Sequence, residues 1–225
     1  MKATSPSSLT ETRERLLQTG VVAFGRRDYD GVSTREIAEA AGANISAISY
    51  HFGGKRGLYL ATVEYLAEQL HSELSESLAA AAQAIDHGDP AACTDVLCDF
   101  VGDYLDLLLN NKRGDSAHGI LFREHNQPTG AYEILYRKLL QPLHSTLTRL
   151  VSCCRGEPQE NCSAILLAHA LLGQTIFFSV ARTTLLKRLD KPAYTTSDIA
   201  QLKRELNRFC RCLLDAPQER KDAKS

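Results

Sequence analysis

Hydrophobic residues recur every three or four positions along most of the chain, which is the spacing of one helix face. The first such stripe consists of Leu16, Leu17, Val21 and Phe24. Ser8 followed by Glu11 has the pattern of a capping box and predicts where this helix begins. No segment of convincing strand length alternates between apolar and polar residues. The pattern therefore predicts an all-α protein of about nine helices.

The next two helices are short and are marked by strong local signals. Ser33 and Glu36 form a second capping-box pattern, so a helix is predicted to start at Thr34. It ends at Gly42, because glycine adopts the left-handed conformation at a helix terminus at little cost. After a three-residue turn, another helix is predicted at residues 45–52. Two short helices joined by such a turn form a helix-turn-helix.

The rest of the pattern is also helical and divides the chain into two parts. Further helices are predicted at about residues 58–85, 90–109, 116–126, 130–154, 160–189 and 197–214, with a kink or break at Pro142. We predict a three-helix, helix-turn-helix DNA-binding domain at residues 1–57, with its motif at about 33–52. A second helical domain is predicted at residues 58–214. The polar tail, residues 215–225, is predicted to be disordered.

Composition and charge restrict the function classes. Hydrophobic residues make up 44% of the chain and charged residues 24%, and no run approaches the ~18 unbroken apolar residues of a membrane span. The N-terminal sequence also lacks the apolar segment of a secretory signal, so we expect a soluble, cytoplasmic protein with no membrane partner. The net charge of −1 by itself argues against a nucleic-acid partner. However, residues 1–57 hold 8 basic and 6 acidic residues, whereas residues 58–114 hold 2 and 10, so the first segment is mildly basic.

The cysteines do not form a recognisable site. They are Cys93, Cys98, Cys153, Cys154, Cys162, Cys210 and Cys212, an odd number without the paired CxxC spacing of a structural zinc site. We expect reduced thiols that pack as small apolar groups, with no metal and no cofactor. A thiol- or metal-responsive regulator with the same DNA-binding domain remains an alternative.

A small helical enzyme is a second alternative, with Cys153, Cys162 and His169 as candidates for nucleophilic or metal chemistry. The sequence argues against it, because it has no GxSxG, HExxH, P-loop or GxGxxG motif. No catalytic residue is therefore predicted.

The second short helix carries residues suited to reading DNA. The major groove is about 12 Å wide and admits one helix, whose small side chains permit close approach. Asparagine and serine can hydrogen-bond to base edges, and alanine or isoleucine methyl groups can contact thymine. A helix N-terminus favours phosphate, as do basic side chains. The candidate DNA-binding residues are Thr34, Arg35, Asn44, Ile45, Ser46, Ala47, Ser49, Tyr50, His51 and Lys55.

The run from residue 33 to 52, STREIAEAAGANISAISYHF, followed by GGKRGLY, resembles the helix-turn-helix of the TetR family of repressors. The resemblance implies a homodimer that binds a pseudo-palindromic operator in double-stranded DNA, and a C-terminal helical domain that binds a small-molecule effector. It places the base readers at residues 44–47, Ser49 and Tyr50, with the other candidates nearer the phosphates. Ser49 departs from the family, which often has tyrosine there.

A second resemblance covers part of the C-terminal region. The stretches LFREHNQPTGAYEILYRKLLQPLHSTLTRLV and LLGQTIFFSVAR are similar to the C-terminal domain of CecR-like members of the family. In that subgroup the resemblance suggests local control of efflux or drug-tolerance genes. We therefore expect a ligand-responsive regulator that represses transcription and is released from DNA by a small-molecule effector.

Aromatic and polar residues of the second domain are candidates for the effector pocket, since such pockets are mostly apolar with a few polar groups. The candidates are Phe100, Tyr104, Phe122, Arg123, His125, Tyr132, Tyr136, His169, Gln174, Phe177, Phe178 and Arg182. The aromatic residues and His169 could equally belong to the core. In the sequence Arg123-Glu124-His125, three polar residues follow an apolar run, so at least one of them should face inward or cap a helix, with surface exposure or a mutual ion pair as the alternative.

The predicted dimer face lies on the last two long helices. Its residues are Leu172, Gly173, Ile176, Leu202, Leu206, Phe209 and Leu213. A glycine within a helix costs about 1 kcal/mol relative to alanine, and close approach of another helix is the usual compensation. The same stripe could be intramolecular core, but the family resemblance favours a four-helix dimer interface.

Overall fold

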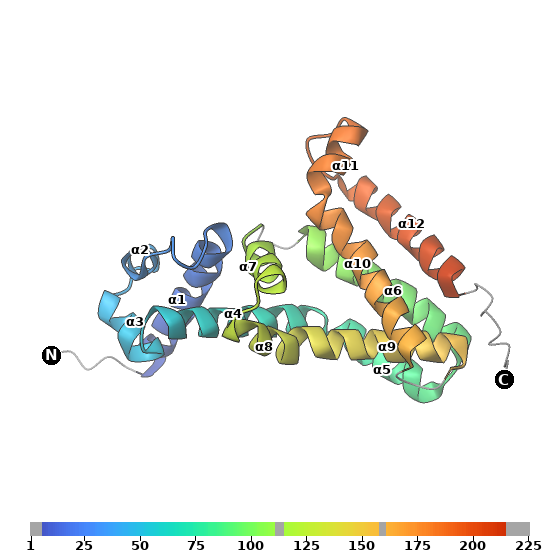
Figure 1. The fold of residues 1–225 in the computed structure, drawn as a ribbon, viewed down its shortest axis with the longest axis horizontal. Helices are drawn as coiled ribbons and strands as arrows, with labels where there is room; N and C mark the ends of the chain where they lie inside the picture. Colours follow the sequence, from blue (N-terminus) through green and yellow to red (C-terminus); the bar gives the residue numbers. More distant parts are fainter. Residues whose placement is uncertain (1–5, 111–114, 158–160, 215–225) are drawn as a thin grey trace, which may run out of the picture. The chain divides into compact units, whose positions relative to one another are not determined.

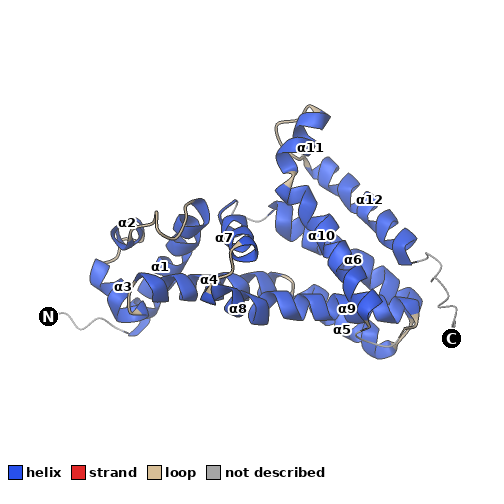
Figure 2. Ribbon diagram, viewed as in Figure 1, coloured by secondary structure: helices blue, strands red, loops and turns tan. Residues whose placement is uncertain are grey.

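All regular structure in the described part of the chain is helical (Figures 1 and 2). The computed structural model describes residues 6–110, 115–157 and 161–214, and the predicted tail lies outside them. The elements are α1 (Pro6–Arg26), α2 (Thr34–Ala40), α3 (Ile45–Phe52), α4 (Lys55–Glu73), α5 (Ser75–His87), α6 (Pro90–Asn110), α7 (Asp115–Asn126), α8 (Gly130–Leu135), the π-helix η1 (Tyr136–Leu140), α9 (Gln141–Arg155), α10 (Cys162–Val180), α11 (Arg182–Leu189) and α12 (Thr196–Leu214). The all-α prediction is confirmed.

The helices form two compact units. Unit 1 comprises α1 to α4, α7, α8 and η1, whereas unit 2 comprises α5, α6, α10 to α12 and α9 from Leu143 onward. The boundary predicted after residue 57 does not separate these units. The reason is packing, because α4 packs on α1, α3 and α8, and α7 packs on α1. Residues 1–57 thus remain the predicted DNA-binding segment, but they do not pack as a unit by themselves.

The capping box predicted at the start of α2 is present in the structure. Ser33 Oγ accepts a hydrogen bond from the backbone N–H of Arg35 at 3.2 Å, and the N–H of Ser33 donates to Glu36 Oε2 at 3.3 Å. Helix α3 ends at Gly53, whose φ of 71° lies in the left-handed region that favours glycine. Ile48 of α3 is buried in unit 1 and anchors this helix.

Other predicted helix boundaries are wrong. Helix α1 begins at Pro6, so Ser8 lies within it and is not its N-cap. Two long predicted helices are each divided by a single residue, at Leu74 and at Ala181. Leu74 is itself buried and continues the apolar stripe from α4 into α5, so hydrophobic spacing could not reveal the division.

The irregularity predicted at Pro142 is a local widening of the helix and not a break. The N–H of Gln141 donates to the carbonyl oxygen of Tyr136, five residues earlier, which closes the π-turn η1. Proline has no N–H, so a regular α-helix would lose one hydrogen bond at this position. A π-turn just before the proline lets α8, η1 and α9 follow one another without a loop.

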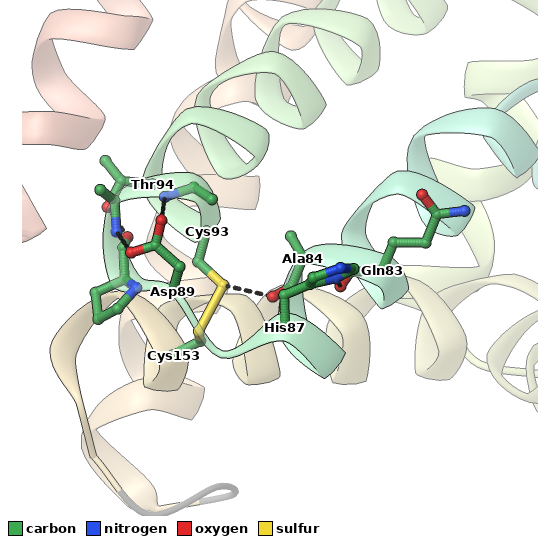
Figure 3. The surroundings of a disulfide bond; sticks show 10 residues. Gln83, Ala84, His87, Asp89, Cys93, Thr94 and Cys153 are labelled. Atoms are coloured by element: carbon green, nitrogen blue, oxygen red, sulfur yellow. Dashed lines mark hydrogen bonds between the residues drawn. A yellow bond between two sulfur atoms is a disulfide. The ribbon is translucent and has the colours of Figure 1, made fainter.

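The core of unit 2 is built from side chains of α5, α6, α9, α10 and α12. Within it, Cys93 in the first turn of α6 forms a disulfide with Cys153 in the last turn of α9 (Figure 3). The expectation of reduced thiols is therefore wrong for these two residues. They are 60 positions apart, so only the packing of the helices that carry them brings their sulfur atoms together.

Helix α10 combines length with an apolar surface. By length and composition alone it could cross a membrane, with a mean hydropathy of 1.7, and 28% of that window is buried in the structure. A search for unbroken apolar runs does not detect this helix, because serine, histidine, glycine, glutamine and threonine interrupt its apolar sequence. Leu166 and Phe177 are 63% and 64% exposed. Unit 2 therefore leaves one side of this helix uncovered.

Candidate functional site

The candidate DNA-binding residues lie on the surface of α2, α3 and the start of α4. Within α3, Ile48 faces the core, whereas Tyr50 is 73% exposed. The exposed candidates are Arg35, Asn44, Ile45, Ser46, Ser49 and Tyr50, and the half-buried ones are Thr34, Ala47, His51 and Lys55. All ten retain accessible surface around one short helix, which is the form that enters a major groove.

Asn44 has a structural role that the sequence analysis did not assign to it. Its Oδ1 atom accepts hydrogen bonds from the backbone N–H of Ser46 at 2.9 Å and from Ser46 Oγ at 2.8 Å, so Asn44 is the N-cap of α3. The side-chain amide oxygen of Asn44 is therefore already hydrogen-bonded in the free protein. The Nδ2 group remains the part of Asn44 that could donate to a base.

Replacing Asn44 with alanine is expected to lower the free energy of unfolding by about 1 kcal/mol, because one N–H of α3 loses its acceptor. Asn44→Ser is the matched control, since serine is an equally good N-cap, and it should unfold close to wild type. Urea unfolding followed by circular dichroism measures both. Equal stability of the alanine and serine variants would contradict the capping role.

Basic side chains beside α3 are held by aromatic rings. The Lys55 Nζ atom lies 4.5 Å from the ring centroid of Tyr29 and donates to the carbonyl oxygen of Asp30 at 3.4 Å. The Arg13 guanidinium lies 5.6 Å from the ring centroid of Phe52. Such cation–π contacts orient the charge without neutralising it. Lys55 thus joins the start of α4 to the turn between α1 and α2.

One acidic residue of α2 is neutralised by its neighbour. Arg27 Nη2 lies 2.8 Å from Glu36 Oε2. The hydrogen bond from Arg27, together with that from the N–H of Ser33, holds the pKa of Glu36 below its ordinary value. The Glu36 carboxylate is therefore paired, which reduces its repulsion of a nearby phosphate.

Unit 1 also contains a cavity of about 950 Å³. It is lined by Asp28, Tyr29, Asp30, Arg56, Tyr59, Leu60, Gly119, Phe122, Arg123, Glu124 and residues 126–130. These residues come from the α1–α2 turn, the first turns of α4, helix α7 and the α7–α8 loop. The cavity thus adjoins the connection that leads into α2 and the helix that follows α3.

A hydrogen-bond network surrounds Glu124, which is completely buried in the cavity wall. Tyr59 Oη donates to Glu124 Oε1 at 2.6 Å, and the N–H of Thr129 donates to Oε2 at 3.0 Å. Burial, and then the hydrogen bond to Glu124, raise the pKa of Tyr59 above its ordinary value. The network fixes the α7–α8 loop against α4. The polar triplet in the sequence correctly indicated an inward-facing residue here but could not say which one.

Arg123 joins α7 to α1 and to the turn after it. Its Nη1 atom donates to the carbonyl oxygen of Phe24 at 2.8 Å, and its Nε atom lies 3.2 Å from Asp28 Oδ1. Arg123 and Phe122 are the predicted effector residues that line the cavity. The sequence analysis did not include Tyr59 and Arg56 among the cavity residues, because only the packing of α4 against α7 and the α1–α2 turn places them there.

The other predicted effector residues do not line this cavity. His125, Tyr132 and Tyr136 belong to unit 1, where the two tyrosine rings stack with centroids 6.2 Å apart. The remaining candidates belong to unit 2 and are Phe100, Tyr104, His169, Gln174, Phe177, Phe178 and Arg182. Phe100 is core, and burial raises the pKa of Tyr104. The structure divides the twelve candidates between the two units, with five in unit 1 and seven in unit 2.

The residues of the predicted dimer face differ in their burial within the single chain. Leu172 and Leu206 are buried within unit 2, so they pack against their own chain and have little surface left for a partner. Ile176, Leu202 and Leu213 are half-buried, whereas Gly173 and Phe209 are exposed. A different set of α10 residues forms an exposed row at helical spacing, which we call the α10 stripe: Leu166, Ala170, Gly173, Phe177 and Val180.

Matches to known families cover most of the chain. Residues 16–62 match the bacterial regulatory proteins of the tetR family, and residues 93–216 match the C-terminal domain of the HTH-type transcriptional dual regulator CecR. The CecR protein of Shigella flexneri is 32% identical over 190 residues, which are 82% of this chain and 82% of that protein.

Solved structures share the fold. AibR in complex with isovaleryl coenzyme A and operator DNA is 15% identical with a TM-score of 0.63, covering 88% of this chain and 97% of that one. A mutant of HlyIIR that carries a linker is 19% identical with a TM-score of 0.60, covering 94% of this chain and 100% of that one. At these identities the likeness concerns the fold alone. The family matches and the CecR relative show that the chain belongs to the TetR family and is a DNA-binding transcriptional regulator, not an enzyme.

Proposed function

We propose that this regulator binds a pseudo-palindromic operator as a homodimer, represses transcription and leaves the DNA when a small-molecule effector binds. The observation that carries the proposal is the exposed surface of α3, with ten candidate residues accessible around a helix capped at both ends. Asn44 to Ala47, Ser49 and Tyr50 are assigned to the bases. Thr34, Arg35, His51 and Lys55 are assigned to the phosphates. The protein would act in the cytoplasm, where its DNA is.

The homodimer is supported by the α10 stripe. Phe177 and Leu166 are large apolar side chains that unit 2 leaves exposed on the same helix as Gly173. A Cβ atom built at Gly173 meets nothing within 4 Å, so the space above this glycine is open to a second helix. One stripe can pair with its own copy across a two-fold axis. Phe209 of α12 is also exposed, and we assign it to the same dimer interface.

The effector is assigned to the cavity of unit 1. A ligand there would contact the α1–α2 turn through Tyr29 and the start of α4 through Arg56, and these segments flank the helix-turn-helix. A ligand that binds one arrangement of these segments more tightly shifts the population toward it. AibR offers a precedent at the level of the fold, since it was solved with both isovaleryl coenzyme A and operator DNA.

Activation at some promoters is a second candidate function. The relative that matches over most of the chain is named a dual regulator, which favours testing both outcomes. Transcription from an operator-bearing promoter in vitro would separate them. Less transcript when the protein is added supports repression, and more transcript contradicts it at that promoter.

DNA selection tests the central proposal. Purified protein is expected to enrich a two-fold symmetric sequence from random duplex DNA and to bind it with an affinity that falls as salt rises. Ala47→Glu, which places a carboxylate on α3, should weaken binding at least 100-fold. Ala80→Glu is the matched control on the exposed face of α5 and should bind like wild type. Failure to enrich any sequence, or equal binding by both variants, would overturn the proposal.

A further inference from the structure

The disulfide of unit 2 joins two cysteines with different environments (Figure 3). Cys93 is completely buried, whereas Cys153 is half-buried and keeps some contact with solvent. A small solute could therefore reach Cys153 first. Cys93 would then act as the partner that closes the bond.

The surrounding structure can also accommodate the reduced form of the Cys93–Cys153 pair. Cys93 Sγ lies 3.4 Å from the carbonyl oxygen of Ala84, which can accept a hydrogen bond from the reduced thiol. Both the dithiol and the disulfide are thus compatible with the surrounding helices. This is what a reversible pair requires, and disulfides that do occur in the cytoplasm are usually transient or redox-sensing.

The neighbouring cysteines are placed differently. Cys98 and Cys210 are buried and hydrogen-bonded to one another. Burial raises the pKa of Cys154, which favours its unreactive thiol form. Cys162 and Cys212 are exposed at the surface. Cys153 therefore combines partial exposure with a second cysteine already at bonding distance.

The bond closes a loop that includes part of unit 1. Between Cys93 and Cys153 the chain passes through α7, α8 and η1, which pack on α1 and α4. Both ends of this excursion lie in unit 2. Oxidation therefore links the two ends of the segment between Cys93 and Cys153 covalently. This segment includes α7, which contributes residues to the cavity of unit 1.

We propose that Cys93 and Cys153 are a reversible oxidation site for hydroperoxides, and that their oxidation changes operator affinity; the second part rests on the proposed function. The Cys153 thiolate attacks a peroxide oxygen and breaks the O–O bond, which yields a sulfenic acid and, after protonation, water. The Cys93 sulfur then attacks the Cys153 sulfur and displaces hydroxide. The thiol proton completes a second water, so two thiols lose two electrons to one hydrogen peroxide. An added dithiol reductant reverses the change.

The experiment treats the reduced full-length protein with hydrogen peroxide and follows it by peptide mass mapping and by fluorescence binding to the selected operator. We expect a linked peptide containing Cys93 and Cys153, at least a threefold change in operator affinity, and recovery of both with dithiothreitol. Cys154→Ser is the matched control and should behave like wild type. Cys153→Ser and Cys93→Ala should show neither the linkage nor the change, and their thermal unfolding in reductant checks that they are folded.

Each result decides part of the proposal. Oxidation at Cys162 or Cys212 without the Cys93–Cys153 linkage would overturn the oxidation site. Linkage without an affinity change would overturn its regulatory effect. If the reduced protein binds no DNA, the proposed operator function fails, whereas the mass mapping still decides whether these two cysteines are the oxidation site.

Discussion

Replacing Gly119 with alanine is expected to lower the free energy of unfolding by about 1–3 kcal/mol, because the added methyl group overpacks the contact between α1 and α7. Elsewhere inside a helix, replacing glycine with alanine usually raises the free energy of unfolding by about 1 kcal/mol. The sign of the change therefore reports on packing rather than on helix propensity.

The physical reason is the crossing of the two helices in unit 1. A Cβ atom at Gly119 would overlap the carbonyl oxygen of Gly25, and one at Gly25 would overlap the carbonyl oxygen of Ser116. Both obstacles are backbone atoms, which cannot move aside as a flexible side chain could. The helices must separate to admit either methyl group, and the buried surface around Phe24 would open with them.

Gly102 provides a matched control in α6. A Cβ atom there would lie 3.7 Å from the Lys203 side chain, which is an ordinary van der Waals contact. Gly102→Ala should therefore be neutral or raise stability by up to about 1 kcal/mol. Urea unfolding of both variants provides the comparison. If both substitutions change the stability in the same direction by similar amounts, the close packing at Gly119 is disproved.

If the proposed homodimer forms through the α10 stripe, replacing Phe177 with glutamate is expected to convert it into monomers and to reduce operator affinity on the order of 100-fold. Phe177 is 64% exposed in the single chain and belongs to the α10 stripe. Burying such a side chain contributes roughly 1.5–3 kcal/mol, and a two-fold axis uses it twice. A carboxylate buried there instead would be unpaired, which costs still more.

Phe122→Glu is the matched control. Phe122 has the same side chain, is 60% exposed and lies on α7, outside the α10 stripe. Analytical ultracentrifugation should show a dimer for this variant and a monomer for Phe177→Glu. A wild-type protein that is already monomeric, or a Phe177→Glu variant that stays dimeric, would contradict the proposed interface.

Much of the local structure around the candidate DNA-binding residues was predictable, because its signals are local. The capping box at Ser33 and the left-handed Gly42 after α2 each act within a few residues, and the structure confirms both features. The role of Asn44 was open to the same kind of reasoning, since asparagine before a helix is a common N-cap. It was missed because asparagine also suits a base reader.

The sequence by itself determined the all-α class, the helix-turn-helix and the family, since helical spacing and caps depend on neighbours in the chain. Only the tertiary structure decided that Leu206 is core and Phe177 is exposed, because an apolar face does not reveal what covers it. The burial of Glu124 and the Cys93–Cys153 bond were likewise decided by helices distant in sequence. Spacing along one helix carries no information about which other helix lies against it, and that pairing is what produces the cavity, the disulfide and the uncovered α10 stripe.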